Sequence, residues 1–167
     1  MMSLIHDNPF RRKFSNPENT LKAAGLKPGL TILEVGCGPG FFTIPTAKIV
    51  TNTGMVYALD IHPLAIERVQ EKIKKNHVTN VKTILASATK TELPDHSIDL
   101  AFLFGIIHRI NEVFEEILEE MYRILRVNGI LSIQKSRPSK EDIIAAVERK
   151  GFMYLTASQR ILRFRKK

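Results

Sequence analysis

The chain has 167 residues, of which 44% are hydrophobic and 25% are charged, so we expect one soluble globular domain. Its single cysteine cannot form an internal disulfide, which fits the cytoplasm. No apolar run approaches the roughly 20 residues that span a bilayer, and the N-terminus lacks the apolar segment of a secretory signal. The net charge of +8 fits either a generally solvated surface or attraction to nucleic acid or anionic metabolites, although the absence of Trp disfavours an aromatic platform for single strands.

Short β-like runs alternate with longer amphipathic segments along the chain. A first helix ends with Thr20–Ala24. The next predicted elements, in chain order, are strand Leu30–Val35, helix Phe41–Val50, strand Met55–Leu59, helix Pro63–Asn76, strand Val81–Ala86 and strand Ile98–Phe104. They are followed by helix Asn111–Leu125, strand Ile130–Gln134, helix Lys140–Lys150 and two hairpin strands, Phe152–Ala157 and Arg160–Arg165.

This order predicts an α/β fold of the Rossmann-like, doubly wound type. Its sheet is seven-stranded and mostly parallel, with an antiparallel C-terminal hairpin. We expect residues 20–167 to form the single domain, and residues 1–19 to be an extension that serves as a lid, a dimer arm or a tail. Ligands bind at the carboxyl ends of such strands, so the chemistry is expected at residues 36–40, 60–61, 86–88 and 104–108.

The first of these segments is a glycine loop. Gly36, Gly38 and Gly40 alternate with Cys37 and Pro39, which lets the backbone turn sharply and approach a ligand closely. The loop leads into a helix N-terminus, which favours a carboxylate or a phosphate. The dinucleotide fingerprint G-x-G-x-x-G fits neither register, because its third glycine would fall on Phe41 or Thr43.

Two acidic residues accompany the loop. Glu34 lies in an otherwise apolar strand, where a carboxylate is costly unless it is paired, and it could meet the cationic end of an amino-acid-like ligand directly or through water. Asp60, at the end of the second strand, could accept both hydroxyls of a ribose. It could instead cap the helix that begins at Pro63, and we favour the ribose role because of the preceding glycine loop.

The chain resembles the class I S-adenosylmethionine-dependent methyltransferases of the small-molecule type that includes ubiquinone and menaquinone biosynthesis enzymes. Four segments carry the resemblance: Ile32–Thr43, Ala58–Ala65, Leu93–Leu100 and Tyr122–Leu131. It covers residues 20–135 well and implies S-adenosylmethionine as cofactor, S-adenosylhomocysteine as product and a small-molecule acceptor.

The resemblance also implies roles for individual residues. Gly36 and Gly38, in the loop with Cys37 and Gly40, would line the methionine part of the cofactor. Asp60 would bind the ribose and Ile61 would cover one face of the adenine. Ser87 and Ala88 stand where the family usually has Asp-Ala, so the acid near the adenine amino group is absent here. Phe104, at the end of the fourth strand, is expected to complete the cofactor site.

The candidate catalytic residue is His108, just beyond the fourth strand. It could take a proton from a hydroxyl or an activated carbon, or it could only orient the loop. Neighbouring Arg109 could hold an anionic substrate or be a surface charge. The histidines show no metal-ligand spacing, so no metal is expected. Phe104–Ile107 lacks the pattern of enzymes that methylate the exocyclic amines of bases, which disfavours DNA.

Three hypotheses remain open from the sequence. The first is a methyltransferase for a small molecule. The second is an RNA or protein methyltransferase that uses the basic surface, and the third is a cofactor-binding module without catalysis. The sequence leaves a homodimer open, and it does not identify the acceptor.

Overall fold

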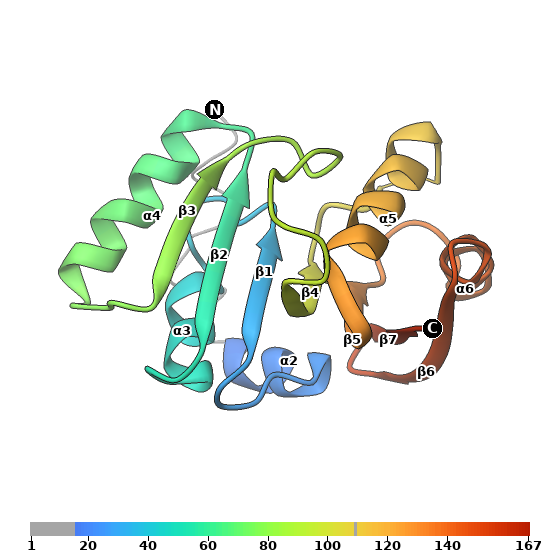
Figure 1. Cartoon of the computed structure of the whole chain (residues 1–167), viewed down its shortest axis with the longest axis horizontal. Coiled ribbons are helices and arrows are strands. Elements are labelled where there is room, and N and C mark those ends of the chain that lie inside the picture. Colours follow the sequence, from blue (N-terminus) through green and yellow to red (C-terminus); the bar gives the residue numbers. More distant parts are fainter. Residues whose placement is uncertain (1–15, 109) are drawn as a thin grey trace.

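The computed structural model describes residues 16–108 and 110–167, whose strands form one seven-stranded sheet in the order β3-β2-β1-β4-β5-β7-β6 (Figure 1). The strands are β1 (Thr31–Val35), β2 (Met55–Asp60), β3 (Val81–Leu85), β4 (Ile98–Leu103), β5 (Leu125–Gln134), β6 (Phe152–Ser158) and β7 (Ile161–Lys166). Strands β1 to β5 pair in parallel, whereas β7 runs antiparallel to both β5 and β6. The predicted fold class is confirmed.

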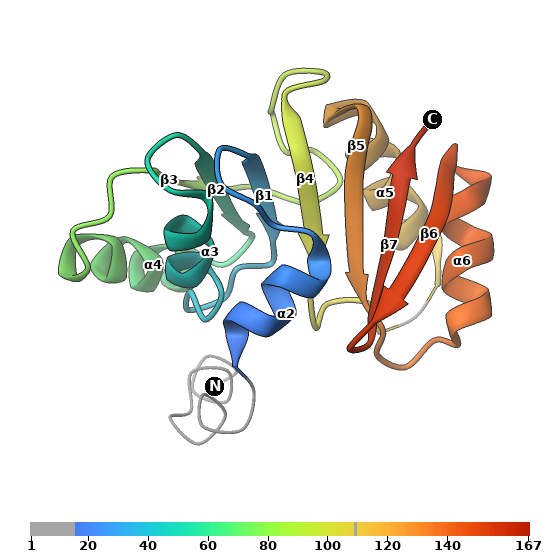
Figure 2. The same cartoon turned by 90° about the horizontal axis from the view of Figure 1, so that it is seen from below.

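Helices cover both faces of the sheet. They are α2 (Pro17–Ala24), α3 (Thr43–Val50), α4 (Pro63–Lys75), α5 (Glu112–Ile124) and α6 (Lys140–Arg149). Figure 2 shows α2 and α3 on the near side of the sheet and α5 on the far side. Successive strand residues point to opposite faces, so Ile32 packs in the cluster under α2 and α3 while Leu33 packs in the cluster under α5 and α6.

Short polar side chains begin three of the helices. The side-chain oxygens of Asn16, Asn111 and Ser139 accept hydrogen bonds from backbone amides in the first turns of α2, α5 and α6. These bonds satisfy donors that have no partner within the helix. Pro63 is the first residue of α4, as its sequence position predicts.

Two boundaries differ from the prediction by more than one residue. Helix α3 begins at Thr43 rather than Phe41, because residues 36–42 form the turns that follow β1. Strand β5 begins at Leu125 rather than Ile130. The predicted turn at Asn128 is instead an irregularity inside the strand, where Asn128 has a φ of +63° and the register with β4 shifts.

The sheet places the ends of β1 and β4 side by side. Strand β1 pairs with β2 on one side and with β4 on the other, so the chain leaves these neighbouring strands in different directions. In open α/β sheets this topological switch point is where ligands bind. Residues 36–40 and 104–108 follow these two strands. Within the described ranges, no helix combines the length and apolar character needed to cross a membrane.

Candidate cofactor and acceptor site

The loop after β1 uses its first two glycines for different reasons. Gly36 and Gly38 have φ values of +69° and +52°. Residues with a side chain are strained in this conformation, whereas glycine is not. A Cβ on Gly36 would come within 2.7 Å of Cγ2 of Ile106, from the segment after β4, whereas a Cβ on Gly38 would meet no atom within 4 Å. The space at Gly38 is therefore open, and the space at Gly36 is filled by the protein itself.

Asp60 ties this loop to the end of β2. One carboxylate oxygen accepts a hydrogen bond of 2.8 Å from the backbone amide of Gly38, and the other accepts one of 2.9 Å from the amide of His62. Asp60 does not cap α4. Its carboxylate accepts from the amide of His62, which precedes the helix, and not from an amide within the helix. Each oxygen keeps lone-pair capacity for a further donor. Asp60 is 7% exposed, and the Gly38 that it contacts has open space where a Cβ would lie.

Glu34 lies beneath the loop and is 2% exposed. Its carboxyl accepts a 2.6 Å hydrogen bond from the hydroxyl of Thr43, the first residue of α3. Burial raises its pKa from 4.5 to about 8, and the carboxylate of Asp60 adds to the rise, while the Thr43 hydroxyl and the charge of Lys72 oppose it. The acid is thus largely protonated at neutral pH and would ionise more readily beside a cation.

Cys37 and Gly40 fix the shape of the loop. The amide of Cys37 donates to the carbonyl of Leu59 over 2.9 Å, which joins the loop to β2. Burial raises the pKa of the Cys37 thiol far above its usual range, so the thiol stays protonated and is a poor nucleophile. Gly40 lets the loop approach α4, because a Cβ there would be 3.1 Å from Cγ2 of Val69.

The predicted adenine side is more open. Ile61 is 59% exposed at the end of β2. Ser87 and Ala88 lie beyond β3, where the Ser87 hydroxyl accepts a hydrogen bond from the amide of Thr89. Further along this segment, Thr91 donates its amide and its hydroxyl to one carboxylate oxygen of Glu120 on α5, over 2.7 and 2.6 Å. Glu120 therefore anchors the segment that carries Ser87.

Phe104 directs its ring away from open space. It is 8% exposed, and its ring centroid lies 5.2 Å from that of Phe42 and 4.6 Å from that of Phe102. These rings belong to the core cluster under α2 and α3. Because Phe42 follows the glycine loop, this aromatic packing joins the ends of β1 and β4.

His108 is exposed and lines a cavity of about 440 Å³. The cavity lies between the segment after β4, the segment after β5 and the surface of α6, which contribute Ile110, Arg137 and Arg149 among others. The hydroxyl of Ser136 donates to the carbonyl of Ile107 and ties the two segments together. In the described residues, no group of three or more His, Cys, Asp or Glu side chains could hold a metal ion.

The sequence predicted Glu34, Asp60 and the glycines, and the structure brings these residues together. Ile61, Ser87 and Ala88 lie at the neighbouring strand ends, and His108 lies toward β5 and α6. Arg109 falls outside the described residues. Sequence reasoning gave no individual role to Thr43, Ile106 or the arginines of the cavity. Thr43 and Ile106 lie in segments that it singled out, whereas no local motif marks the arginines.

Solved structures share this architecture. A SAM-dependent methyltransferase from Aquifex aeolicus superimposes with a TM-score of 0.81 and 28% identity, covering 95% of this chain and 92% of that one. The [4+2]-cyclase SpnF superimposes with a TM-score of 0.75 and 15% identity, covering 90% of this chain and 79% of that one, a similarity of fold alone. The sheet order, the glycine loop and the first likeness define a class I S-adenosylmethionine-dependent methyltransferase fold.

Comparison of the sequence with known families gives the same class. The model described as "Methyltransferase domain" matches residues 26–164, and the chain belongs to this family. A demethylmenaquinone methyltransferase from Geobacillus sp. (strain WCH70) is 31% identical over 132 residues, which are 78% of this chain and 56% of the relative. The chain thus spans about half the length of the curated relatives it matches.

Proposed function

We propose that the protein transfers the methyl group of S-adenosylmethionine to a small organic acceptor. The observation that carries the proposal is the Asp60 carboxylate, which the amide of Gly38 holds beside an open space at the end of β1. A fixed carboxylate with free lone pairs suits the two hydroxyls of a ribose, and it would repel a 2′-phosphate.

The residues around Asp60 fit the rest of this cofactor. Gly38 leaves room for the methionine part, and Glu34 offers a buried acid whose ionisation a nearby ammonium group would favour. Exposed Ile61 offers an apolar surface to the adenine, and the Ser87 hydroxyl a weak polar contact in place of an acid.

Around the residues that would hold it, S-adenosylmethionine would supply an electrophilic methyl group on a sulfonium, and the acceptor atom would supply the electron pair for the new bond while the sulfur would keep the pair of the old one. The chain's task is to align the acceptor and to exclude water. An acceptor carbon or hydroxyl must also release a proton. His108 lines the neighbouring cavity, which supports it as the group that accepts this proton.

The family relatives favour a small molecule over RNA or protein as acceptor. The Geobacillus relative is named for demethylmenaquinone, a small organic molecule. The same fold occurs in the [4+2]-cyclase SpnF, and a transfer assay with labelled cofactor distinguishes the two reactions.

Calorimetry with S-adenosylhomocysteine tests the cofactor assignment. We expect Asp60→Ala to weaken binding about 100-fold, because two hydrogen bonds to a charged acceptor are lost. Asp60→Asn, which keeps an oxygen for the Gly38 amide, should fall between Asp60→Ala and the natural protein. Glu67→Ala, an exposed acid on α4, is the matched control and should bind normally.

Two outcomes would contradict the assignment. Unchanged affinity in a folded Asp60→Ala variant would remove the ribose role. The absence of binding by the natural protein would remove the cofactor. Transfer of label from methyl-labelled cofactor to a small-molecule extract then tests catalysis, and label only in macromolecules would favour an RNA or protein acceptor.

A further inference from the structure

The cavity beside His108 is walled by three segments that are far apart in the chain. His108 and Ile110 come from the segment after β4, and Arg137 and Pro138 from the segment after β5. Helix α6 contributes Asp142, Ala145 and Arg149, whose spacing puts them on one helix face. A volume of about 440 Å³ suits a small organic molecule.

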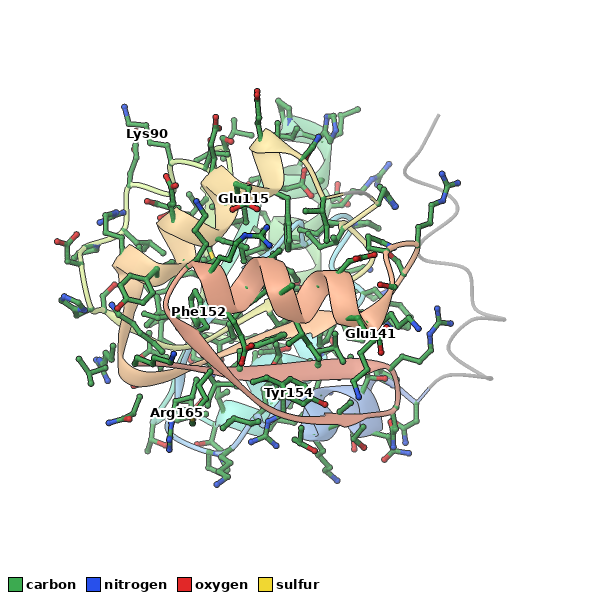
Figure 3. All side chains as sticks on the ribbon, turned by 90° about the vertical axis from the view of Figure 1, so that its right-hand side faces the viewer. Lys90, Glu115, Glu141, Phe152, Tyr154 and Arg165 are labelled. Carbon is green, nitrogen blue, oxygen red and sulfur yellow. The ribbon has the colours of Figure 1, made fainter. Side chains whose placement is uncertain are left out.

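The charged side chains that line the cavity differ in whether they have a partner within the protein. Arg149 donates to Glu115 on α5 over 2.9 Å, and the Asp142 carboxylate accepts a 2.6 Å hydrogen bond from the Ser139 hydroxyl at the start of α6. Figure 3 shows this side of the molecule, with Glu115 and Glu141 labelled on α5 and α6. Arg137, which is exposed, forms no hydrogen bond or ion pair with the residues that the structure describes. Its guanidinium is the lining charge without an internal counter-ion there.

The cavity lies next to the cofactor loop. Ile106 packs against Gly36, and His108 follows two residues later and faces the cavity. Two residues of extended chain span at most about 7 Å. The hydroxyl of Ser136, next to Arg137, bonds the carbonyl of the intervening Ile107. One short segment therefore contacts the proposed cofactor site on one side and the cavity on the other.

We infer that this cavity binds the methyl acceptor and that the acceptor carries an anionic group, such as a carboxylate, which pairs with Arg137. A planar guanidinium binds a carboxylate through two parallel hydrogen bonds, a recognition that a neutral amide cannot reproduce. The apolar walls formed by Ile110, Pro138 and Ala145 suit the carbon skeleton of the same molecule. The inference rests on the proposed function, since it names the class of acceptor for that reaction.

Paired probes test the charge preference directly. The 167-residue chain, saturated with S-adenosylhomocysteine, is titrated with benzoate and with the neutral isostere benzamide, and binding is followed by NMR. We expect benzoate to bind with a Kd of about 10 mM or tighter, the range for so small a ligand, and at least about tenfold more tightly than benzamide. Arg137→Gln should remove this preference, and Arg137→Lys should retain part of it.

Arg165→Gln is the matched control. Arg165 is an exposed arginine on β7, and Figure 3 shows it far from Glu141 at the start of α6. This variant should leave both affinities unchanged. Asp142→Asn should strengthen benzoate binding, because it removes a negative charge from the cavity wall.

A second measurement uses the reaction. Extract metabolites separated by anion exchange are offered with labelled S-adenosylmethionine, and label should enter the retained, anionic fraction. Arg137→Gln should raise KM at least about tenfold with a smaller change in kcat. Equal affinities for the two probes, or no benzoate binding while S-adenosylhomocysteine still binds, would overturn the inference and leave the proposed function intact. Failure of S-adenosylhomocysteine to bind would instead overturn the proposed function.

Discussion

The region beneath the glycine loop and the region around α5 each bury a glutamate, but the two carboxyl groups have very different hydrogen-bond donors around them. Glu34 is 2% exposed and Glu120 is 8% exposed. Glu120 accepts two hydrogen bonds of 2.8 Å from the guanidinium of Arg123, besides those from Thr91. Glu34 has one hydroxyl donor, Thr43, and the charges of Asp60 and Lys72 near it act on its pKa in opposite directions.

The pKa values express this difference. The Arg123 guanidinium lowers the pKa of Glu120 to about 2 despite its burial, and Thr91 adds to the effect. Burial raises the pKa of Glu34 to about 8. Around α5 the chain supplies its own donors and gains stability, whereas beneath the loop it leaves an acid under-satisfied. Such an acid beside an open space is typical of a ligand site.

The largest expected effect is on the pH dependence of stability near Glu34. An acid whose pKa is raised on folding binds its proton more tightly when folded, so stability should fall between pH 4.5 and about 8 and then level off. Glu34→Gln keeps an oxygen for Thr43 and cannot ionise. Relative to this variant, the natural protein should be equally stable near pH 4 and on the order of a few kcal/mol less stable at pH 9.

Urea unfolding at several pH values measures this difference, with Glu67→Gln on the surface of α4 as the control that should show none. A stability difference that stays constant from pH 4 to 9 would show that Glu34 ionises normally. The contrast between the two regions would then be wrong.

A smaller effect is expected at the contact between the loop and the end of β4. Gly36→Ala introduces a Cβ at a φ of +69° and 2.7 Å from Cγ2 of Ile106, so we expect a loss of about 2 kcal/mol in unfolding free energy. In the Ile106→Ala background, Gly36→Ala should cost about 1 kcal/mol less, because the collision is absent but the backbone strain remains. Gly38→Ala should suffer the strain alone.

The double-mutant cycle from thermal or urea unfolding gives the coupling between Gly36 and Ile106. Strictly additive losses would mean that the two residues do not meet. Gly38→Ala sharpens the comparison further, since its Cβ would enter the open space and should weaken S-adenosylhomocysteine binding more than its modest loss of stability explains.

The arrangement around the glycine loop could be predicted from the sequence because its determinants are local. Glu34, the glycines and Asp60 lie within one strand–loop–helix–strand unit, and periodicity alone predicts the strands that carry them. The partner of Glu34 and the neighbour of Gly36 could not be predicted in this way. Ile106 reaches Gly36 only because β4 pairs with β1, a pairing that the sequence pattern does not state.

The cavity side was harder to predict for the same reason. His108, Arg137 and Arg149 come from three segments and share no spacing, so only the packing of α6 brings them to one cavity. The start of β5 also differs from the prediction. Asn128-Gly129 has the composition of a turn, yet pairing with β4 on both sides of it keeps the strand continuous.

The smallest expected effect completes the comparison at Glu120. Glu120→Gln keeps an acceptor for Thr91 but loses the charge that pairs with Arg123. Because Arg123 is partly exposed and also pairs with Asp95, we expect a loss of only about 1 kcal/mol at neutral pH. An acid with a lowered pKa stabilises the fold above its unfolded value, so this difference should shrink as pH falls from 4.5 toward 2. Urea unfolding between pH 7 and 3 should thus show a dependence opposite in sign to that of Glu34. If the stabilities at both glutamates changed with pH in the same direction, burial alone would set both pKa values. The donors around α5 would then not distinguish a structural acid from one kept for a ligand.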